Sequence, residues 1–408
     1  LKPDIIIKTN VPFGGGRMPV NFQQLREQIH EMGQNAPALQ AERQDRLDQA
    51  SRLLNELAND LPALTELVGR AAALAPHLRC ATPAAEPLDF TAPARPPDPH
   101  LTLLAADGSQ INPSAHDSVP FGVINVGVFE MHPGQGSPPL VHTRSRLLTP
   151  EEVFTDHGML GEEVVALMRD LREREELLEL ARQHPVPVIT LTDGPLELYH
   201  EPQDNARFRR ELQHYTEVLE ELAAAGVVAA GYVEKSRSDL LVRLLELAQL
   251  DREGRLAQAG KDRPFKFITD IDLLRSRIGP GERSAVLGIQ TAAEGHFTGR
   301  LAVHYFYINV SPTAKPYLAR VEIPAWVAQS QPLVALLHGA LLWQCQQMGA
   351  HASPYALHRA HEVAVVRLDE KQQIEDMITA ELRRQKVAVE QKSHKQANKE
   401  LPGKRRRP

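Results

Sequence analysis

The chain has few cysteines and lacks long apolar runs. Only Cys80 and Cys345 occur among 408 residues, which excludes a disulfide scaffold or a thiolate zinc cluster and favours a reducing, cytoplasmic location. No stretch approaches 18 uninterrupted apolar residues, so no membrane span is expected. The start of the sequence lacks the charged and then apolar layout of a signal peptide. With 42% apolar residues, we expect a globular protein with an ample core.

The charge of the chain is unevenly distributed. The net charge is −6, but residues 383–408 hold ten Lys or Arg against two Glu, which leaves −14 for the rest. Such a basic tail is typical of a disordered segment that contacts the phosphates of nucleic acid. A solvated end without a function is the alternative.

Three segments are predicted along the chain. Residues 1–100 read as an N-terminal helical segment with a break at Pro62, followed over residues 81–100 by a linker with six prolines. Residues 101–370 alternate strands with helices and predict an α/β domain. Residues 371–408 are expected to hold the end of a C-terminal helix and the basic, disordered tail.

The hydrophobic periodicity places the individual elements. Strands are expected at 101–106, 121–129, 187–192, 226–233, 299–310 and 318–323, and helices at 20–78, 161–183, 204–225, 239–250, 331–348 and 355–385. Only a loop separates the first two strands, so part of the sheet is expected to be antiparallel.

Two apolar strands are each followed by an aspartate and a glycine. The first runs into a predicted turn at Asp107-Gly108, and the second into Asp193-Gly194. The carboxyl ends of strands are where α/β folds bind their ligands. Asp-Gly is also a common turn dipeptide, so a purely structural turn is the alternative at either site. The pairing of the two acids favours a functional site.

The helix expected at 161–183 supplies a third acid. On a helical wheel, Glu175 falls inside the apolar stripe, whereas Glu176 points away from it. A buried charge must be paired, neutralised or bound to a cation, and an ion pair with a nearby Arg is the structural alternative. Three converging carboxylates are the oxygen ligands that Mg²⁺ and Mn²⁺ prefer, and such a centre suits phosphodiester cleavage.

Basic side chains in loops after strands are candidates for contacts with phosphates. Lys235, Ser236 and Arg237 follow one strand, and Arg283 lies in a later loop. A solvated surface is the alternative for each of them, and Arg283 could instead hold a contact within the fold.

Two competing motifs are incomplete. The glycine spacing of residues 226–231 is that of a P-loop, but Tyr232 and Val233 stand where Lys and Ser or Thr are needed. His361-Glu362 begins like a zinc-protease helix, but Val365 occupies the position of the second His.

Taken together, the motifs over residues 100–370 resemble the NurA nuclease domain family. The order and spacing of six short motifs carry this resemblance: Ala106-Asp107-Gly108-Ser109, Asp193-Gly194-Pro195-Leu196, Val233-Glu234-Lys235-Ser236, Gly281-Glu282-Arg283-Ser284, Arg320-Val321-Glu322-Ile323-Pro324, and residues 353–361 with Tyr355 and His361. The family's last motif often begins with a tyrosine, for which Ser353 stands here.

The resemblance implies an RNase H-like fold, a mixed sheet flanked by helices, and a Mn²⁺ (or Mg²⁺) site. It implies 5′ to 3′ exonuclease and single-strand endonuclease activity on DNA, in a homodimer docked on the hexameric ATPase HerA. Carried over, the site residues are Asp107, Glu175 or Glu176, Asp193, Tyr355 and His361. A DNA-binding subunit that has lost cleavage, and a metal phosphoesterase acting on RNA, are the alternatives.

Overall fold

The computed structural model describes residues 21–115, 117, 119–155, 158–198, 206–291, 296–313, 315–349 and 353–387. Its strands are β1 (Cys80–Thr82), β2 (Thr91–Pro93), β3 (Thr102–Ile111), β4 (Gly122–Met131), β5 (Leu140–Leu148), β6 (Phe154–Thr155), β7 (Gly158–Met159), β8 (Val188–Asp193), β9 (Val228–Val233), β10 (Glu282–Ser284), β11 (Leu287–Gln290), β12 (Val303–Asn309) and β13 (Leu318–Pro324).

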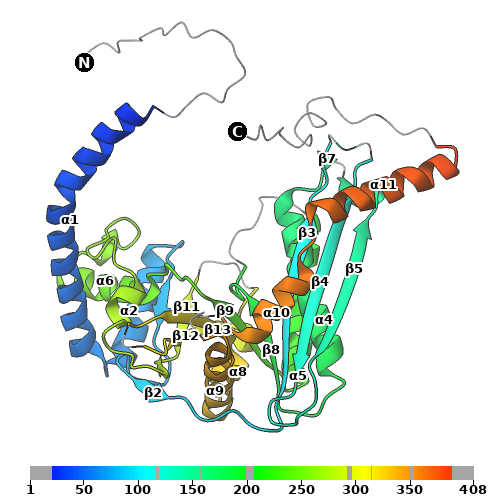
Figure 1. Cartoon of the computed structure of the whole chain (residues 1–408). Coiled ribbons are helices and arrows are strands. Elements are labelled where there is room, and N and C mark those ends of the chain that lie inside the picture. The colour runs from blue at the N-terminus through cyan, green and yellow to red at the C-terminus, as the bar shows by residue number, and fades with distance from the viewer. Residues whose placement is uncertain are drawn as a thin grey trace, which may run out of the picture.

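Helices pack against these strands, and α1 extends away from them (Figure 1). They are α1 (Phe22–Leu57), α2 (Leu61–Leu74), α3 (Pro150–Val153), α4 (Glu162–Ala181), α5 (Ala206–Ala224), α6 (Leu240–Arg252), α7 (Asp270–Leu274), α8 (Ala325–Ala328), α9 (Gln331–Gln347), α10 (Tyr355–Ala364) and α11 (Leu368–Arg384), with 3-10 turns at Leu256–Gln258 and Gly299–Leu301. None of the helices in the described ranges is long and apolar enough to cross a membrane.

One large mixed sheet organises the molecule. Its strand order is β1-β11-β12-β13-β9-β8-β3-β4-β5, with β10 pairing with β12 and β2. In the half that ends at β5, β3 pairs in parallel with β8 and β8 in parallel with β9, whereas β4 is antiparallel to β3 and to β5. The predicted class, a mixed α/β sheet flanked by helices, is confirmed.

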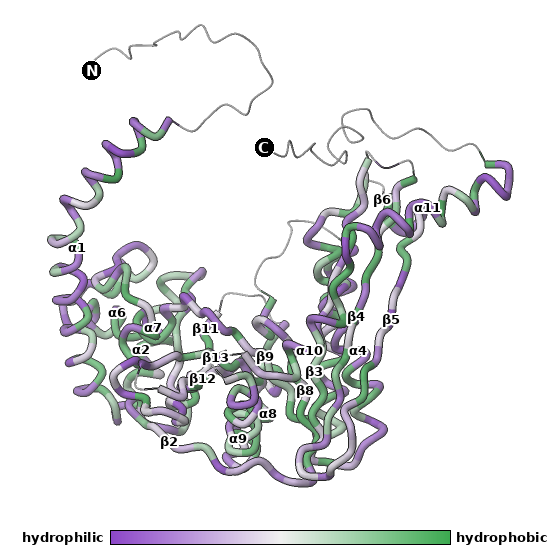
Figure 2. Tube along the Cα trace, in the orientation of Figure 1, coloured by the Kyte–Doolittle hydropathy of each residue, from purple (hydrophilic) through white to green (hydrophobic). Residues whose placement is uncertain are grey.

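Side chains alternate between the two faces of the central strands, as the period of an extended chain requires. Leu104 and Ala106 of β3 pack with α4 and α5, whereas Leu103 and Ala105 pack with α9 and α10. Both faces of β3 are therefore covered, which explains why its first half reads as a continuous apolar run. Figure 2 shows hydrophobic stretches in green along the central strands and the helices.

The N-terminal helices belong to a third cluster of buried residues. Leu54 of α1 and Leu64 of α2 pack with α6 and with the buried rings of Tyr305 and Tyr307 on β12. The break predicted at Pro62 is confirmed, because α2 begins at Leu61 with this proline in its first turn.

Three predictions of local structure are wrong, and β5 was not predicted. Asp107 to Gln110 do not form a turn, because β3 stays paired with β4 as far as Ile111. The linker expected at 81–100 contributes strands to the sheet, since β1 pairs with β11 and β2 with β10. The helix expected at 355–385 is interrupted at residues 365–367. Strand β5 was missed because its residues are mostly exposed and polar.

The division of the chain at residues 100 and 370 remains a prediction. The basic tail expected at the end of the chain lies, from residue 388 onward, outside the described residues.

Candidate active site

Two neighbouring parallel strands each present an aspartate at the same edge of the sheet. β3 and β8 are paired up to Ala106 and Thr192, so that Asp107 and Asp193, one residue further on, lie next to each other. The side chain of Asp193 reaches solvent, yet partial desolvation and the carboxylates of Asp107 and Glu234 raise its pKa. Negative charge is therefore concentrated at this edge.

His361 of α10 contacts the first aspartate. Its Nδ1 lies 2.6 Å from Asp107 Oδ2. A carboxylate can only accept a hydrogen bond, so Nδ1 carries the proton and Nε2 of a neutral ring remains available as a base or ligand. The His361 side chain is 62% exposed and the Asp107 side chain 17%, so this pair lies at the surface of the site.

The C-terminal end of α10 is fixed to the sheet, which positions His361. The carbonyl oxygen of Ala364 accepts hydrogen bonds from Ser109 Oγ at 2.5 Å and from Asn125 Nδ2 at 2.8 Å. Gly127 of β4 allows the close approach, because an added Cβ would lie 2.8 Å from the Ala364 nitrogen. A larger residue at position 127 would therefore push α10 away from β4.

Helix α4 presents Glu173 to β3. The side chain is buried, and an added Cβ on Gly108 would lie 2.7 Å from Glu173 Oε1. Burial, together with the carboxylates of Asp170 and Asp107, raises the pKa of Glu173 well above its usual value, although Arg174 and Arg169 act in the opposite direction. Glu173 is thus a buried glutamate of α4 whose pKa the Asp107 carboxylate helps to raise.

The structure corrects the expected position of Glu175. Its side chain forms an ion pair with Arg172, three residues earlier, and approaches His214 of α5 at 3.5 Å. Glu176, the alternative, forms an ion pair with Arg144 of β5 at 2.9 Å. Of the three acids, Glu173 is the buried one, and sequence reasoning missed it.

Glu234 is a second acid that sequence reasoning missed. It directly follows β9, which lies beside β8, and it contributes to the raised pKa of Asp193. The hydroxyl of Tyr317 donates a hydrogen bond of 2.9 Å to Glu234 Oε1. The signal that singled out the two aspartates, an acid at the end of an apolar strand, is present here as well.

Tyr355 lies at the first position of α10 and packs against the sheet. Its ring meets that of Phe129 of β4 edge to face, with the centroids 5.7 Å apart. Phe129 pairs with Ala105 of β3, which lies two residues before Asp107. Tyr355 therefore packs on the sheet close to the position of Asp107. Its predicted catalytic role remains a prediction.

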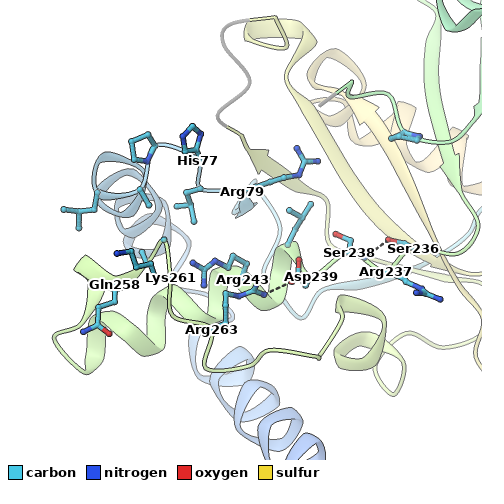
Figure 3. Close-up of a pocket in the computed structure, with 18 of the residues that line it drawn as sticks. His77, Arg79, Ser236, Arg237, Ser238, Asp239, Arg243, Gln258, Lys261 and Arg263 are labelled. Atoms are coloured by element: carbon cyan, nitrogen blue, oxygen red, sulfur yellow. Dashed lines mark hydrogen bonds and ion pairs between the residues drawn. The ribbon is translucent and has the colours of Figure 1, made fainter. Parts of the chain in front are cut away.

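A basic pocket of about 980 Å³ includes Pro195, which follows the Asp193-Gly194 turn. Its wall comes from the segment between α2 and β1, the loop between β9 and α6, and the chain after α6 (Figure 3). The charged residues that line it are Arg79, Lys235, Arg237, Asp239, Arg243, Lys261, Arg263 and Arg320. Asp239 is the only acid among these lining residues, so the pocket suits an anionic group.

Some of these cations already have partners. Arg79 pairs with Glu197, and Arg263 with Asp239. In the part of the chain that the structure describes, no ion pair involves Lys235 or Arg237. Ser236, by contrast, is buried, and its Oγ accepts a hydrogen bond from the backbone N–H of Ser238 at 3.2 Å. Of the three, Lys235 and Arg237 are therefore best placed to meet a phosphate.

Comparison with known proteins identifies the family. The NurA domain matches residues 101–366, which is more than half of the chain. The chain belongs to the NurA domain family. The solved structures similar to this NurA chain include the NurA nuclease from Sulfolobus solfataricus, with 13% identity over 72% of this chain and 87% of that one and a TM-score of 0.45.

Two further solved structures are similar to this NurA chain. A NurA crystallised with manganese has 10% identity over 71% of this chain and 91% of that one, with a TM-score of 0.42. Endonuclease V from Ciona intestinalis, in complex with a 24mer DNA, has 11% identity over 68% of this chain and 87% of that one, with a TM-score of 0.28. No curated protein matches. The predicted family is confirmed, and so is the α/β class with its mixed sheet flanked by helices.

The acids near this edge match a divalent cation in the chemistry of their donor atoms. Asp107, Glu173 and Asp193 offer only oxygen atoms, which Mg²⁺ and Mn²⁺ prefer. The pKa values of Glu173 and Asp193 are raised in part by Asp107. A bound cation would offset the repulsion that raises these pKa values.

Arg283 is not available to DNA, which corrects its predicted role in this NurA chain. Its side chain is buried and forms a bidentate ion pair with Glu86 at 2.6 and 2.8 Å. The guanidinium also lies over the ring of Phe90, with Cζ 5.2 Å from the centroid. Arg283 therefore joins the β1–β2 region to β10.

Replacement of Arg283 by alanine should destabilise the fold without altering DNA binding by the folded protein. The substitution leaves the Glu86 carboxylate buried without its charged partner, at a cost of about 3–5 kcal/mol. Denaturant unfolding of the wild type and Arg283→Ala would measure this loss. An unchanged unfolding midpoint together with weakened DNA binding would contradict the structural role.

Proposed function

We propose that this chain is a divalent-metal-dependent nuclease that cleaves DNA. The observation that carries the proposal is that Asp107 and Asp193 lie side by side on paired strands, with His361 on Asp107 and the buried Glu173 packed against the neighbouring Gly108. The names of the similar solved structures, the NurA nuclease and NurA with manganese, support the same activity.

In this proposal Asp107, Glu173 and Asp193 hold Mn²⁺ or Mg²⁺, and Glu234 adds negative charge beside them. The bound metal would supply positive charge that activates water and stabilises the leaving oxygen of a phosphodiester. Asp107 fixes the ring of His361 through Nδ1, so that Nε2 can exchange a proton with the leaving group. Tyr355 remains a candidate for positioning the substrate.

The basic pocket supports DNA as the substrate. Lys235 and Arg237 follow β9, the strand whose end also carries Glu234, and would hold phosphates close to the carboxylates. Negative charge at the cutting edge repels free DNA, so the pocket supplies attraction beside it. The activities that we propose are 5′ to 3′ exonuclease and single-strand endonuclease cleavage of DNA.

We further propose a HerA-type hexameric ATPase and a second copy of this chain as partners. The first half of α1 supports this proposal, because it extends away from the body (Figure 1) and exposes large apolar side chains. Phe22 is 71%, Ile29 60% and Met32 67% exposed. A cytoplasmic location fits Cys80 and Cys345, which are buried thiols outside any disulfide.

Glu173 and Glu175 give a matched test of the metal site, since they are chemically identical and two residues apart. We expect Glu173→Gln and Asp107→Asn to lower the rate of cleavage of end-labelled DNA about a hundredfold or more in Mn²⁺ or Mg²⁺, because each change removes an anionic metal ligand. Glu175→Gln should stay within about twofold of the wild type, since loss of a partly exposed ion pair away from Asp107 changes little.

The outcome also separates the alternatives. Loss of cleavage in Glu175→Gln but not in Glu173→Gln would overturn the assignment. If the wild type binds DNA but cleaves none, even with the ATPase and ATP present, the non-catalytic DNA-binding subunit is the better hypothesis. Cleavage of RNA alone would favour the phosphoesterase alternative.

Lys235→Ala and Arg237→Ala should weaken DNA binding uniformly across sequences. Loss of one phosphate contact should reduce the slope of log K against log salt by about 0.7 for single strands and 0.9 for duplexes. Fluorescence anisotropy over a salt series would measure this slope. Arg52→Ala, on the exposed surface of α1, removes the same charge elsewhere and should leave the slope unchanged. Equal slopes in all variants would place the DNA outside this pocket.

A further inference from the structure

A second cluster of potential metal ligands surrounds Glu130 at the end of β4. The Glu130 side chain is 3% exposed, and its Oε1 lies 3.0 Å from His132 Nε2 and 3.1 Å from His184 Nε2. Its Oε2 lies 2.9 Å from Nε2 of His142. In the described part of the chain, the ion pairs of this buried carboxylate involve imidazoles and no Lys or Arg.

Three separate elements bring these residues together. Glu130 and His132 are two residues apart at the end of β4 and so share one face, whereas His142 comes from the neighbouring strand β5. His184 follows the C-terminal end of α4. The rings of His132 and His184 have their centroids 5.2 Å apart at an interplanar angle of 57°, so two Nε2 atoms and one carboxylate oxygen converge on one point.

The spacing of these atoms suits a small transition-metal ion. The ligand atoms of Glu130, His132 and His184 lie within 4.8 Å of one another. A tetrahedral Zn²⁺ with bonds of about 2.0–2.1 Å separates its ligand atoms by about 3.3 Å, so the cluster needs only small shifts to bind one.

Contacts outside the three ligand atoms orient the cluster. Thr102 Oγ1 lies 3.3 Å from His132 Nδ1, which helps to fix the ring with Nε2 toward Glu130, as the outer partners of metal-binding histidines do. His142 holds the second carboxylate oxygen. This arrangement leaves Oε1 directed toward His132 and His184.

The cluster is separate from the carboxylates of the proposed active site. Glu130 pairs with Leu104 of β3, whereas Asp107 pairs with Gly127, so the two sites are about 10 Å apart along the strand. Their chemistry also differs, because imidazole nitrogens suit Zn²⁺ and an all-oxygen set suits Mg²⁺ or Mn²⁺. The two sites should therefore prefer different ions.

We propose that Glu130, His132 and His184 bind a transition-metal ion of the Zn²⁺ type, with His142 positioning Glu130. The ion would join the end of β4 to the end of α4. That helix carries Glu173, and the turn after it leads into β8, which carries Asp193. Metal at this cluster would thus stabilise the two elements that deliver acids to the active-site edge. This inference does not depend on the proposed function.

The test is Zn²⁺ binding to the full-length chain after treatment with a chelator. Calorimetry and elemental analysis should find one Zn²⁺ per chain retained in Asp107→Asn, because the sites are separate. His132→Gln and His184→Gln should each weaken Zn²⁺ binding by about a hundredfold or more, whereas His142→Gln, which changes an outer partner, should weaken it about 10–100-fold. Zn²⁺ should also raise the thermal midpoint of the wild type and not that of His184→Gln.

His30→Gln, on the exposed surface of α1, is the matched control and should bind Zn²⁺ as the wild type does. Circular dichroism of each variant without metal verifies that it is folded. No Zn²⁺ binding by the folded wild type would show that the imidazoles only form hydrogen bonds to Glu130 and would overturn the proposal. Zn²⁺ binding that is lost in Asp107→Asn but kept in His132→Gln and His184→Gln would overturn it as well.

Discussion

The parallel pairing of β3 with β8 and of β8 with β9 is the constraint on which the candidate site depends. Where parallel strands pair in register, residues at matching positions lie side by side, so the acids at the point where this pairing ends must lie together. Asp107, Asp193 and Glu234 reach this edge from three strands. Glu173 reaches it from α4, because Gly108 has no side chain to separate that helix from β3.

Like charges held this close would oppose one another without compensation. Arg169 and Arg174 partly offset the charge of Glu173, and His361 partly offsets that of Asp193. The raised pKa values of these two acids indicate that this compensation is incomplete. A fold that concentrates carboxylates in this way loses stability unless a cation binds, and perturbed groups of this kind are typical of functional sites.

The sequence was sufficient to predict that the two aspartates lie near each other, because each directly follows a run of apolar residues that a local pattern identifies as a strand, although β3 continues past Asp107 to Ile111. The sequence was insufficient to predict which glutamate of α4 is buried, because α4 packs both against the sheet and against α5. A helix buried on two sides does not have the single apolar stripe that a helical wheel assumes. The helical wheel therefore predicted burial of Glu175, whereas Glu173 is the buried residue. The burial of Arg283 depends on Glu86, 197 residues away, which no local pattern reveals.

The most direct test of the account is the position of Mn²⁺ in crystals of the full-length chain, located by its anomalous scattering. We expect a peak within bonding distance of carboxylate oxygens of Asp107, Glu173 and Asp193. A peak at Glu175 or Glu176, or a well-ordered site edge that binds no Mn²⁺ at concentrations that support cleavage, would contradict it.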